Sequence, residues 1–320
     1  MRKATKIWLM IAALLVVVGC VMFALVMSAY QYDFDKLSTE TFETNTHEIN
    51  NEFSNISMHT DTADITFVLS NDGKCRVECY EEAKAKHSVA VQDDTLVIKV
   101  SDEKSWYDYI GINVDSPKIT VYLPGTEYTS LCIDESTGGI EIPDNFKFES
   151  VDISLSTGAV QLFASASNSI RIEASTGSIS VENISAGALD LSVSTGTITV
   201  SGVTCAGDAN ISVSTGKTHL TDVACKNLTS SGNTGDIFLN HVIAAEKFLI
   251  ERSTGDVRFD GSDAAEIFVE TDTGDVTGTL LTDKIFMTQT DTGSIDVPKT
   301  TTGGKCEIST DTGDIRISIK

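Results

Sequence analysis

Positive charge, proline and the motifs of common enzymes are scarce in this sequence. Its 320 residues include 23 Lys and Arg against 46 Asp and Glu, for a net charge of −23, and only four prolines. An acidic surface repels the phosphate backbone, so we expect no nucleic-acid partner. There is no C-x-x-C pair, nucleophile elbow, phosphate-binding glycine loop or dinucleotide motif. The sequence therefore predicts a protein that is not an enzyme and holds no cofactor.

Carboxylates are abundant enough to leave one enzymatic alternative open. Glycoside chemistry needs a pair of carboxyl groups across the scissile bond, and β-helical enzymes that act on polysaccharides are known. Those enzymes usually build a cleft from long corner loops, whereas the repeats in this chain are short and regular. A polysaccharide-active β-helix enzyme is kept as a third functional hypothesis, behind two non-catalytic ones.

Charge is absent from one long stretch near the N-terminus. Residues 1–6 form a basic tail, and residues 7–29 contain no charged side chain. Twenty-three apolar residues are long enough to cross a bilayer as a helix, and the basic flank places the N-terminus in the cytoplasm and the rest outside. The alternatives are a cleaved secretion signal and a lipoprotein anchored at Cys20, because Val17-Val18-Gly19-Cys20 resembles a lipobox. We interpret residues 30–45 as a polar tether.

The region from 46 to 130 reads as irregular β-structure. Short runs alternate apolar and polar residues between turn signals, as in the run at 96–100, and no segment keeps a helical period. The segment 62–65 looks like a degenerate copy of the later repeat, about four periods ahead of it. An insertion at 104–114 breaks the strand rhythm with Trp106, Tyr107 and Tyr109. These aromatics form either a contact patch or a cover over the protein's own core.

From residue 131 to residue 320 the chain repeats. Thr-Gly recurs in phase ten times, at intervals of 19 or 20 residues. Apolar residues lie two apart on each side of the Thr-Gly, and their parity changes across it, so each repeat supplies two short strands joined by a glycine turn. One repeat cannot bury its own apolar face, and stacked coils can. The sequence predicts an all-β solenoid of 19–20-residue coils, with hairpins in a sandwich or barrel as the alternative.

Stacking in register brings two kinds of side chain together. The residue before each Thr is Ser, Asn or Asp, which predicts a hydrogen-bonded ladder along one edge. Where the column turns acidic it could instead hold calcium, with the candidate ligands Asp272, Asp275, Asp291, Asp311 and Asp314. Cys205 and Cys225 lie 20 residues apart at the same repeat position, so stacked coils place them within range of a disulfide.

The repeated Ser/Asp-Thr-Gly-Asp/Ser-Ile unit, the strand Ile119-Thr-Val-Tyr-Leu-Pro124 and the N-terminal anchor together resemble a known family. It is the bacterial "putative adhesin" β-repeat family of unknown function, and the resemblance covers about residues 46–320. It implies a right-handed β-helix-like domain displayed outside a bacterial cell. The implied function is an adhesin-like binding or structural module that contacts a cell-wall polymer or an envelope protein. The second hypothesis is an accessory or sensor protein of an envelope-stress system.

Overall fold

The computed structural model describes residues 3–29, 31–32, 41–102 and 115–320. Trp106, Tyr107 and Tyr109 lie outside these residues, so the contact patch stays a prediction. One helix precedes twenty strands: α1 Lys3–Ala29, β1 Phe42–Ile49, β2 Asn55–Thr62, β3 Asp64–Leu69, β4 Cys75–Glu82, β5 Ala85–Gln92, β6 Thr95–Asp102, β7 Lys118–Leu123, β8 Glu127–Ile142, β9 Lys147–Leu162, β10 Ser165–Glu182, β11 Ser185–Cys205, β12 Ala209–Thr234, β13 Ile237–Asn240, β14 Ile243–Thr254, β15 Val257–Thr273, β16 Val276–Leu280, β17 Lys284–Thr292, β18 Ile295–Asp296, β19 Gly304–Thr312 and β20 Ile315–Ile319.

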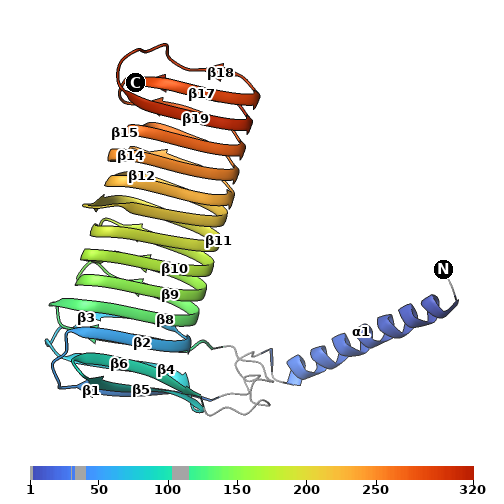
Figure 1. The fold of residues 1–320 in the computed structure, drawn as a ribbon. Helices are drawn as coiled ribbons and strands as arrows, with labels where there is room; N and C mark the ends of the chain where they lie inside the picture. The colour runs from blue at the N-terminus through green and yellow to red at the C-terminus, as the bar shows by residue number, and fades with distance from the viewer. Residues whose placement is uncertain (1–2, 30, 33–40, 103–114) are drawn as a thin grey trace.

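The helix α1 stands clear of the strands in Figure 1. Its segment Thr5–Ala29 has a mean hydropathy of 3.0 and is long and apolar enough to cross a membrane. Cys20 lies exposed within this helix. The strand β1 begins at Phe42, inside the stretch that the sequence analysis assigns to the tether.

The strands stack into one rod, and the predicted solenoid is confirmed (Figure 1). From β8 to β15 successive coils pair in parallel, with each Thr-Gly beside the next, as in Thr157 with Thr176 and Thr176 with Thr195. The apolar columns point inward, and almost all of their side chains are buried in one continuous core. Burial of that shared core, rather than of any single coil, stabilises the rod.

The glycine of the repeat is needed for stacking as well as for its backbone angle. Gly196 has a φ of +150°, and a β-carbon placed on it would lie 1.7 Å from the carbonyl oxygen of Gly177, one coil away. No side chain fits at such a distance. The column of glycines therefore sets how closely the corners of neighbouring coils approach.

The last two coils are stacked in the reverse of chain order. The strand β19 pairs with β15 on one side and with β17 on the other. Likewise β20 lies between β16 and β18. The C-terminal coil is therefore inserted, and the coil made by β17 and β18 ends the rod (Figure 1).

The N-terminal end of the rod is also built out of chain order. Thr62 pairs with Thr137, so the degenerate copy of the repeat at 62–65 lies directly against β8. The expected gap of four periods between them is wrong, because residues 70–117 leave the stack. Within that stretch β4 pairs antiparallel with β1 and β7, and β5 pairs antiparallel with β6. These antiparallel strands close this end of the core.

Candidate functional site

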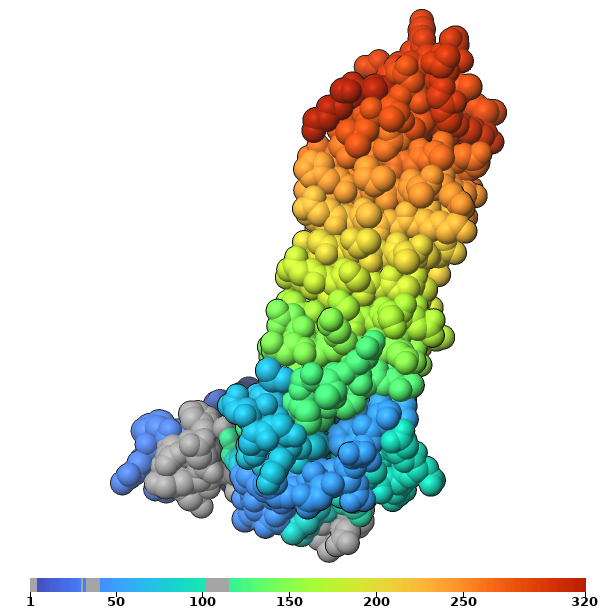
Figure 2. Space-filling model, turned by 90° about the vertical axis from the view of Figure 1, so that its left-hand side faces the viewer, coloured from blue at the N-terminus to red at the C-terminus, as the bar shows by residue number. Residues whose placement is uncertain are grey.

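The surface of the rod carries open grooves between neighbouring coils, and the face in Figure 2 shows no deep cleft. One groove of about 390 Å³ contains Glu251, Glu270 and Asp272 beside Arg252. Glu251 and Glu270 are paired in register on the outer face of β14 and β15, so they lie side by side along the rod. They do not face each other across a gap that would hold a glycosidic bond.

The hydrogen-bonded ladder is present, but it uses the residue after the glycine. Asp256 Oδ1 accepts the Asp275 N–H at 3.0 Å, and Asp275 Oδ1 accepts the Asp314 N–H at 2.8 Å. In the next coil Asp314 Oδ1 accepts the N–H of Ser294 at 2.7 Å and its hydroxyl at 2.8 Å, and these bonds lower the pKa of Asp314. Each carboxylate thus satisfies a corner N–H of the adjacent coil.

The calcium candidates are divided by this ladder. Asp275 and Asp314 have carboxylate oxygens engaged with backbone N–H groups. Asp272, Asp311 and Asp291 precede the threonines and are exposed, and the register stacks them in that order in three successive coils. Within the described residues the five do not form a group whose ligand atoms converge within 4.8 Å. Calcium at this edge stays a prediction.

Cys205 and Cys225 occupy equivalent buried positions in adjacent coils, because Thr204 pairs with Ala224 immediately before them. Burial raises the pKa of Cys225 to about 12, and the nearby Cys205 adds to the effect. Both are free thiols in this structure. The disulfide between them stays a prediction.

Two charged side chains are buried in the column that precedes the Thr-Gly corner by one residue. Arg252 donates to Val213 O at 3.0 Å and to Thr218 Oγ1 at 3.1 Å, and burial lowers its pKa to about 10. Its guanidinium fills space left by Gly232, where a β-carbon would lie 1.6 Å from Nη1. Near the other end of the rod, burial raises the pKa of Glu135 to about 8.

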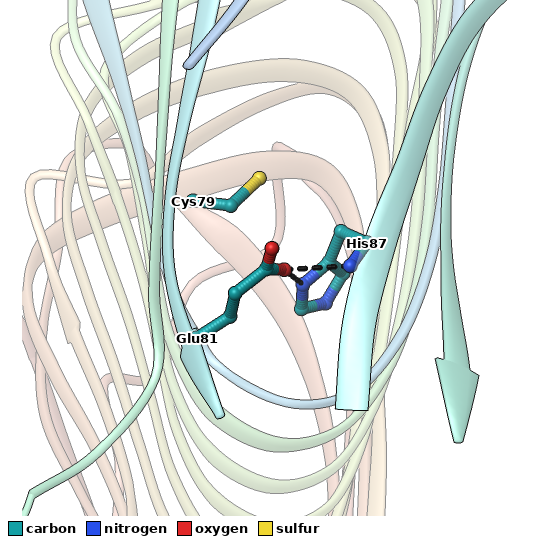
Figure 3. A group of neighbouring side chains, drawn as sticks. All are labelled: Cys79, Glu81 and His87. Carbon is teal, nitrogen blue, oxygen red and sulfur yellow. Dashed lines mark hydrogen bonds and ion pairs between the residues drawn. The ribbon is translucent and has the colours of Figure 1, made fainter. Parts of the chain in front are cut away.

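A third buried polar group lies at the N-terminal end of the core. Cys79 and Glu81 on β4 and His87 on β5 point toward one another (Figure 3), and their ligand-type atoms lie within 4.8 Å of each other. Glu81 Oε2 lies 2.7 Å from His87 Nδ1 and accepts the His87 backbone N–H at 2.6 Å. Asn45 Nδ2 donates to the other carboxylate oxygen at 2.8 Å. All three side chains of the group are at least 94 % buried.

This group does not have the geometry of a cysteine nucleophile with its base. A catalytic thiol gives its proton to the imidazole nitrogen that faces it, but His87 Nε2 has no hydrogen-bond partner in the described part of the chain. Burial, with the nearby Glu81, raises the pKa of Cys79 to about 12. The thiol is also completely inaccessible to a substrate.

Sequence reasoning missed the group because its members do not form a motif. Cys79 and Glu81 alternate on one strand as two inward residues do, but His87 comes from the next strand. The β4–β5 turn that brings it back was not recognised. The signal was an acidic residue at the inward parity of a strand whose other inward residues, Cys75, Val77 and Cys79, are apolar.

The geometry so far defines an acidic, parallel β-solenoid with capped and open ends. The chain belongs to the Toastrack DUF4097 family, whose model matches residues 53–214 and again residues 206–320. This confirms the resemblance carried by the Thr-Gly repeats. No curated protein matches the chain.

Solved structures of the same kind come from gut bacteria. A "putative lipid binding protein" from Parabacteroides distasonis is 17 % identical, with 74 % of this chain and 94 % of that one covered and a TM-score of 0.48. A "putative adhesin" from Bacteroides fragilis is also 17 % identical, with coverages of 87 % and 97 % and a TM-score of 0.36. A second "putative adhesin" from P. distasonis is 11 % identical, with coverages of 85 % and 98 % and a TM-score of 0.39. None of these names denotes an enzyme.

Proposed function

We propose that this protein is a membrane-anchored, non-catalytic binding module whose solenoid lies outside the cytoplasm of a bacterial cell. The observation that carries the proposal is the order of its parts. A basic tail precedes an apolar helix of spanning length, and an acidic rod follows it. Basic residues favour the cytoplasmic side of a membrane. The 20 basic and 46 acidic residues after Tyr30 give the rod a net charge of about −26, which suits exposure to solvent.

Protease accessibility tests this topology. With an epitope tag at the C-terminus of the full chain, protease added to spheroplasts should remove the tag while a cytoplasmic marker stays intact. Protection of the tag until the membrane is broken would contradict the proposal. Metabolic labelling with an alkynyl fatty acid separates the two anchors. A spanning helix predicts no label, whereas a lipoprotein predicts label that the Cys20→Ser variant loses.

The end of the rod formed by β17 and β18 is the best candidate for the contact surface. Within the described residues β17 pairs with β19 alone and β18 pairs with β20 alone, so their outer edges carry unpaired backbone groups. Ile285, Met287 and Ile295 are 45 %, 53 % and 45 % exposed there. An edge of this kind binds an extended protein segment by strand addition. It therefore favours an envelope protein over a cell-wall polymer as the partner.

Site-specific photo-crosslinking in living cells tests the contact surface. A photoreactive residue at Met287 should give a discrete crosslinked species that the single substitution Ile285→Lys weakens. The matched control at Ser154, an exposed position midway along the rod, should give none. Equal crosslinking at both positions would overturn the edge as the contact site. Co-sedimentation of the protein with purified cell-wall sacculi would instead identify the polymer as the partner.

The acidic charge favours one second candidate. A rod with a net charge of about −26 attracts cationic peptides, which is what an accessory protein of an envelope-stress system would need. Binding of a labelled cationic peptide to the full chain should then weaken steeply with salt. Binding that does not change with salt would remove this candidate.

A further inference from the structure

The buried group of Cys79, Glu81 and His87 has the composition of a transition-metal site. Thiolate, imidazole and carboxylate are the three ligand types that Zn²⁺ takes from proteins. Calcium and magnesium prefer oxygen ligands alone, so a site that offers one sulfur and one nitrogen selects against both. From these three side chains and their burial, we propose that Cys79, Glu81 and His87 bind one Zn²⁺ ion with a water molecule as the fourth ligand.

The placement of the three ligands supports this assignment. Cys79 and Glu81 are two residues apart on β4, so both project from the same face of the strand, and His87 faces them from β5 (Figure 3). The ligand-type atoms already lie within 4.8 Å of one another. A metal bound at their centre would need only a small inward movement of side chains to reach bonds of about 2.0–2.3 Å.

The hydrogen bonds around the group prepare the carboxylate for a metal. Asn45 Nδ2 donates to Glu81 Oε1 from β1, and the His87 backbone N–H donates to Glu81 Oε2. Partners of this kind orient metal-binding carboxylates. The His87 ring makes one hydrogen bond, from Nδ1 to Glu81, within the described residues. Exchanging that bond for a metal bond breaks no other contact of the ring, and Cys79 Sγ makes no hydrogen bond there.

Charge neutrality also favours a divalent ion in this buried place. One thiolate, one carboxylate and a neutral imidazole carry a charge of −2, which Zn²⁺ cancels. Binding converts the Cys79 thiol to a thiolate and releases its proton to solvent, while no bond is oxidised or reduced. A neutral cluster is far less costly to bury than an isolated carboxylate.

The expected consequence is a metal cross-link within the strands that close the N-terminal end of the core. It joins β4, which pairs with β1 and β7, to β5, which pairs with β6. Since structural zinc couples to folding, the ion would be taken up as this region folds.

Metal analysis of the full chain in detergent tests the proposal. Protein made in zinc-supplemented medium should retain roughly one zinc per chain. Chain refolded with Co²⁺ should show a thiolate-to-cobalt charge-transfer band in the near ultraviolet. The Cys79→Ser and His87→Ala variants should lose the band and the bound zinc. The matched control, Cys306→Ser, changes another buried thiol with a pKa of about 12 near the far end of the rod and should keep both.

A measurement on the unaltered chain keeps the test decisive if the variants fail to fold. Refolding with zinc should raise the thermal unfolding midpoint by several degrees relative to refolding with a chelator. Folded wild-type protein without bound metal, and with the same midpoint under both conditions, would overturn the proposal. That result would assign the group to a buried structural ion pair between Glu81 and His87. Equal zinc content in the Cys79→Ser variant and the wild type would overturn it as well.

Discussion

The protonation of Glu135 should make the stability of the rod fall as pH rises through neutrality. Glu135 is 1 % exposed and lies where β8 packs on β2. Its Oε1 accepts the N–H groups of Ala63 and Thr137 at 3.1 and 3.3 Å, while Oε2 has no partner in the described part of the chain. Burial outweighs these two hydrogen bonds and raises the pKa of the carboxyl from 4.5 to about 8.

The sign and size of the effect follow from proton binding. Between pH 4.5 and pH 8 the folded chain holds a proton that the unfolded chain has released, so the folded state is favoured by acid. The contribution is fully present below pH 4.5 and is lost as pH rises through 8. Each pH unit in this window is worth at most about 1.4 kcal/mol. Allowing for partial solvation of the ionised form, we expect a loss of about 2 kcal/mol between pH 5 and pH 7.

Urea unfolding of the full chain in detergent, followed by far-ultraviolet circular dichroism at a series of pH values, measures this loss. The Glu135→Gln variant keeps the shape and removes the proton equilibrium, so its stability relative to the wild type should rise by about 2 kcal/mol from pH 5 to pH 7. Glu141→Gln, an exposed position on the same strand, is the control and should follow the wild type. Parallel pH curves for Glu135→Gln and the wild type would refute the reasoning.

Three further predictions concern the stacking of the coils. Gly196→Ala should destabilise the chain by more than about 3 kcal/mol in urea unfolding, because its β-carbon would overlap a carbonyl of the next coil. Gly73→Ala, in an open turn, should cost about 1 kcal/mol. Asp275→Ala should cost about 1 kcal/mol by unpairing the Asp314 N–H, and a thermal midpoint equal to that of Asp272→Ala would contradict this. Deleting 304–320 should also expose 284–296 to limited proteolysis, since β17 and β18 pair only with the deleted coil in the described structure.

The regular part of this fold could be predicted from the sequence because one physical requirement repeats in it. Each coil must bury the same two inward columns, so apolar residues recur two apart on either side of every Thr-Gly. The ladder was assigned to the wrong residue, before the threonine instead of after the glycine. Both positions carry short polar side chains, and only the backbone at the corner determines that Asp256 and Asp275 reach the N–H of a neighbouring coil.

The irregular parts could not be predicted because they depend on contacts between residues far apart in the chain. Nothing local in residues 55–65 distinguishes a strand that lies next to β8 from one that lies four coils away. The register of Thr62 with Thr137 appears only when the antiparallel strands between them have left the stack. The buried cluster has the same origin, since His87 reaches Glu81 through a turn rather than through a repeat.

The two ends of the rod differ in a way that bears on both proposals. At the N-terminal end, antiparallel strands cover the core, and a metal ion bound by Cys79, Glu81 and His87 would lock that cover in place. At the other end, inserting β19 between β15 and β17 leaves the strand Lys284–Thr292 as the last one, with its outer edge unpaired. A solenoid can grow or bind only at an unpaired edge. The closed end lies on the side of the chain that is joined to the membrane helix, so the open end is the one available to a partner.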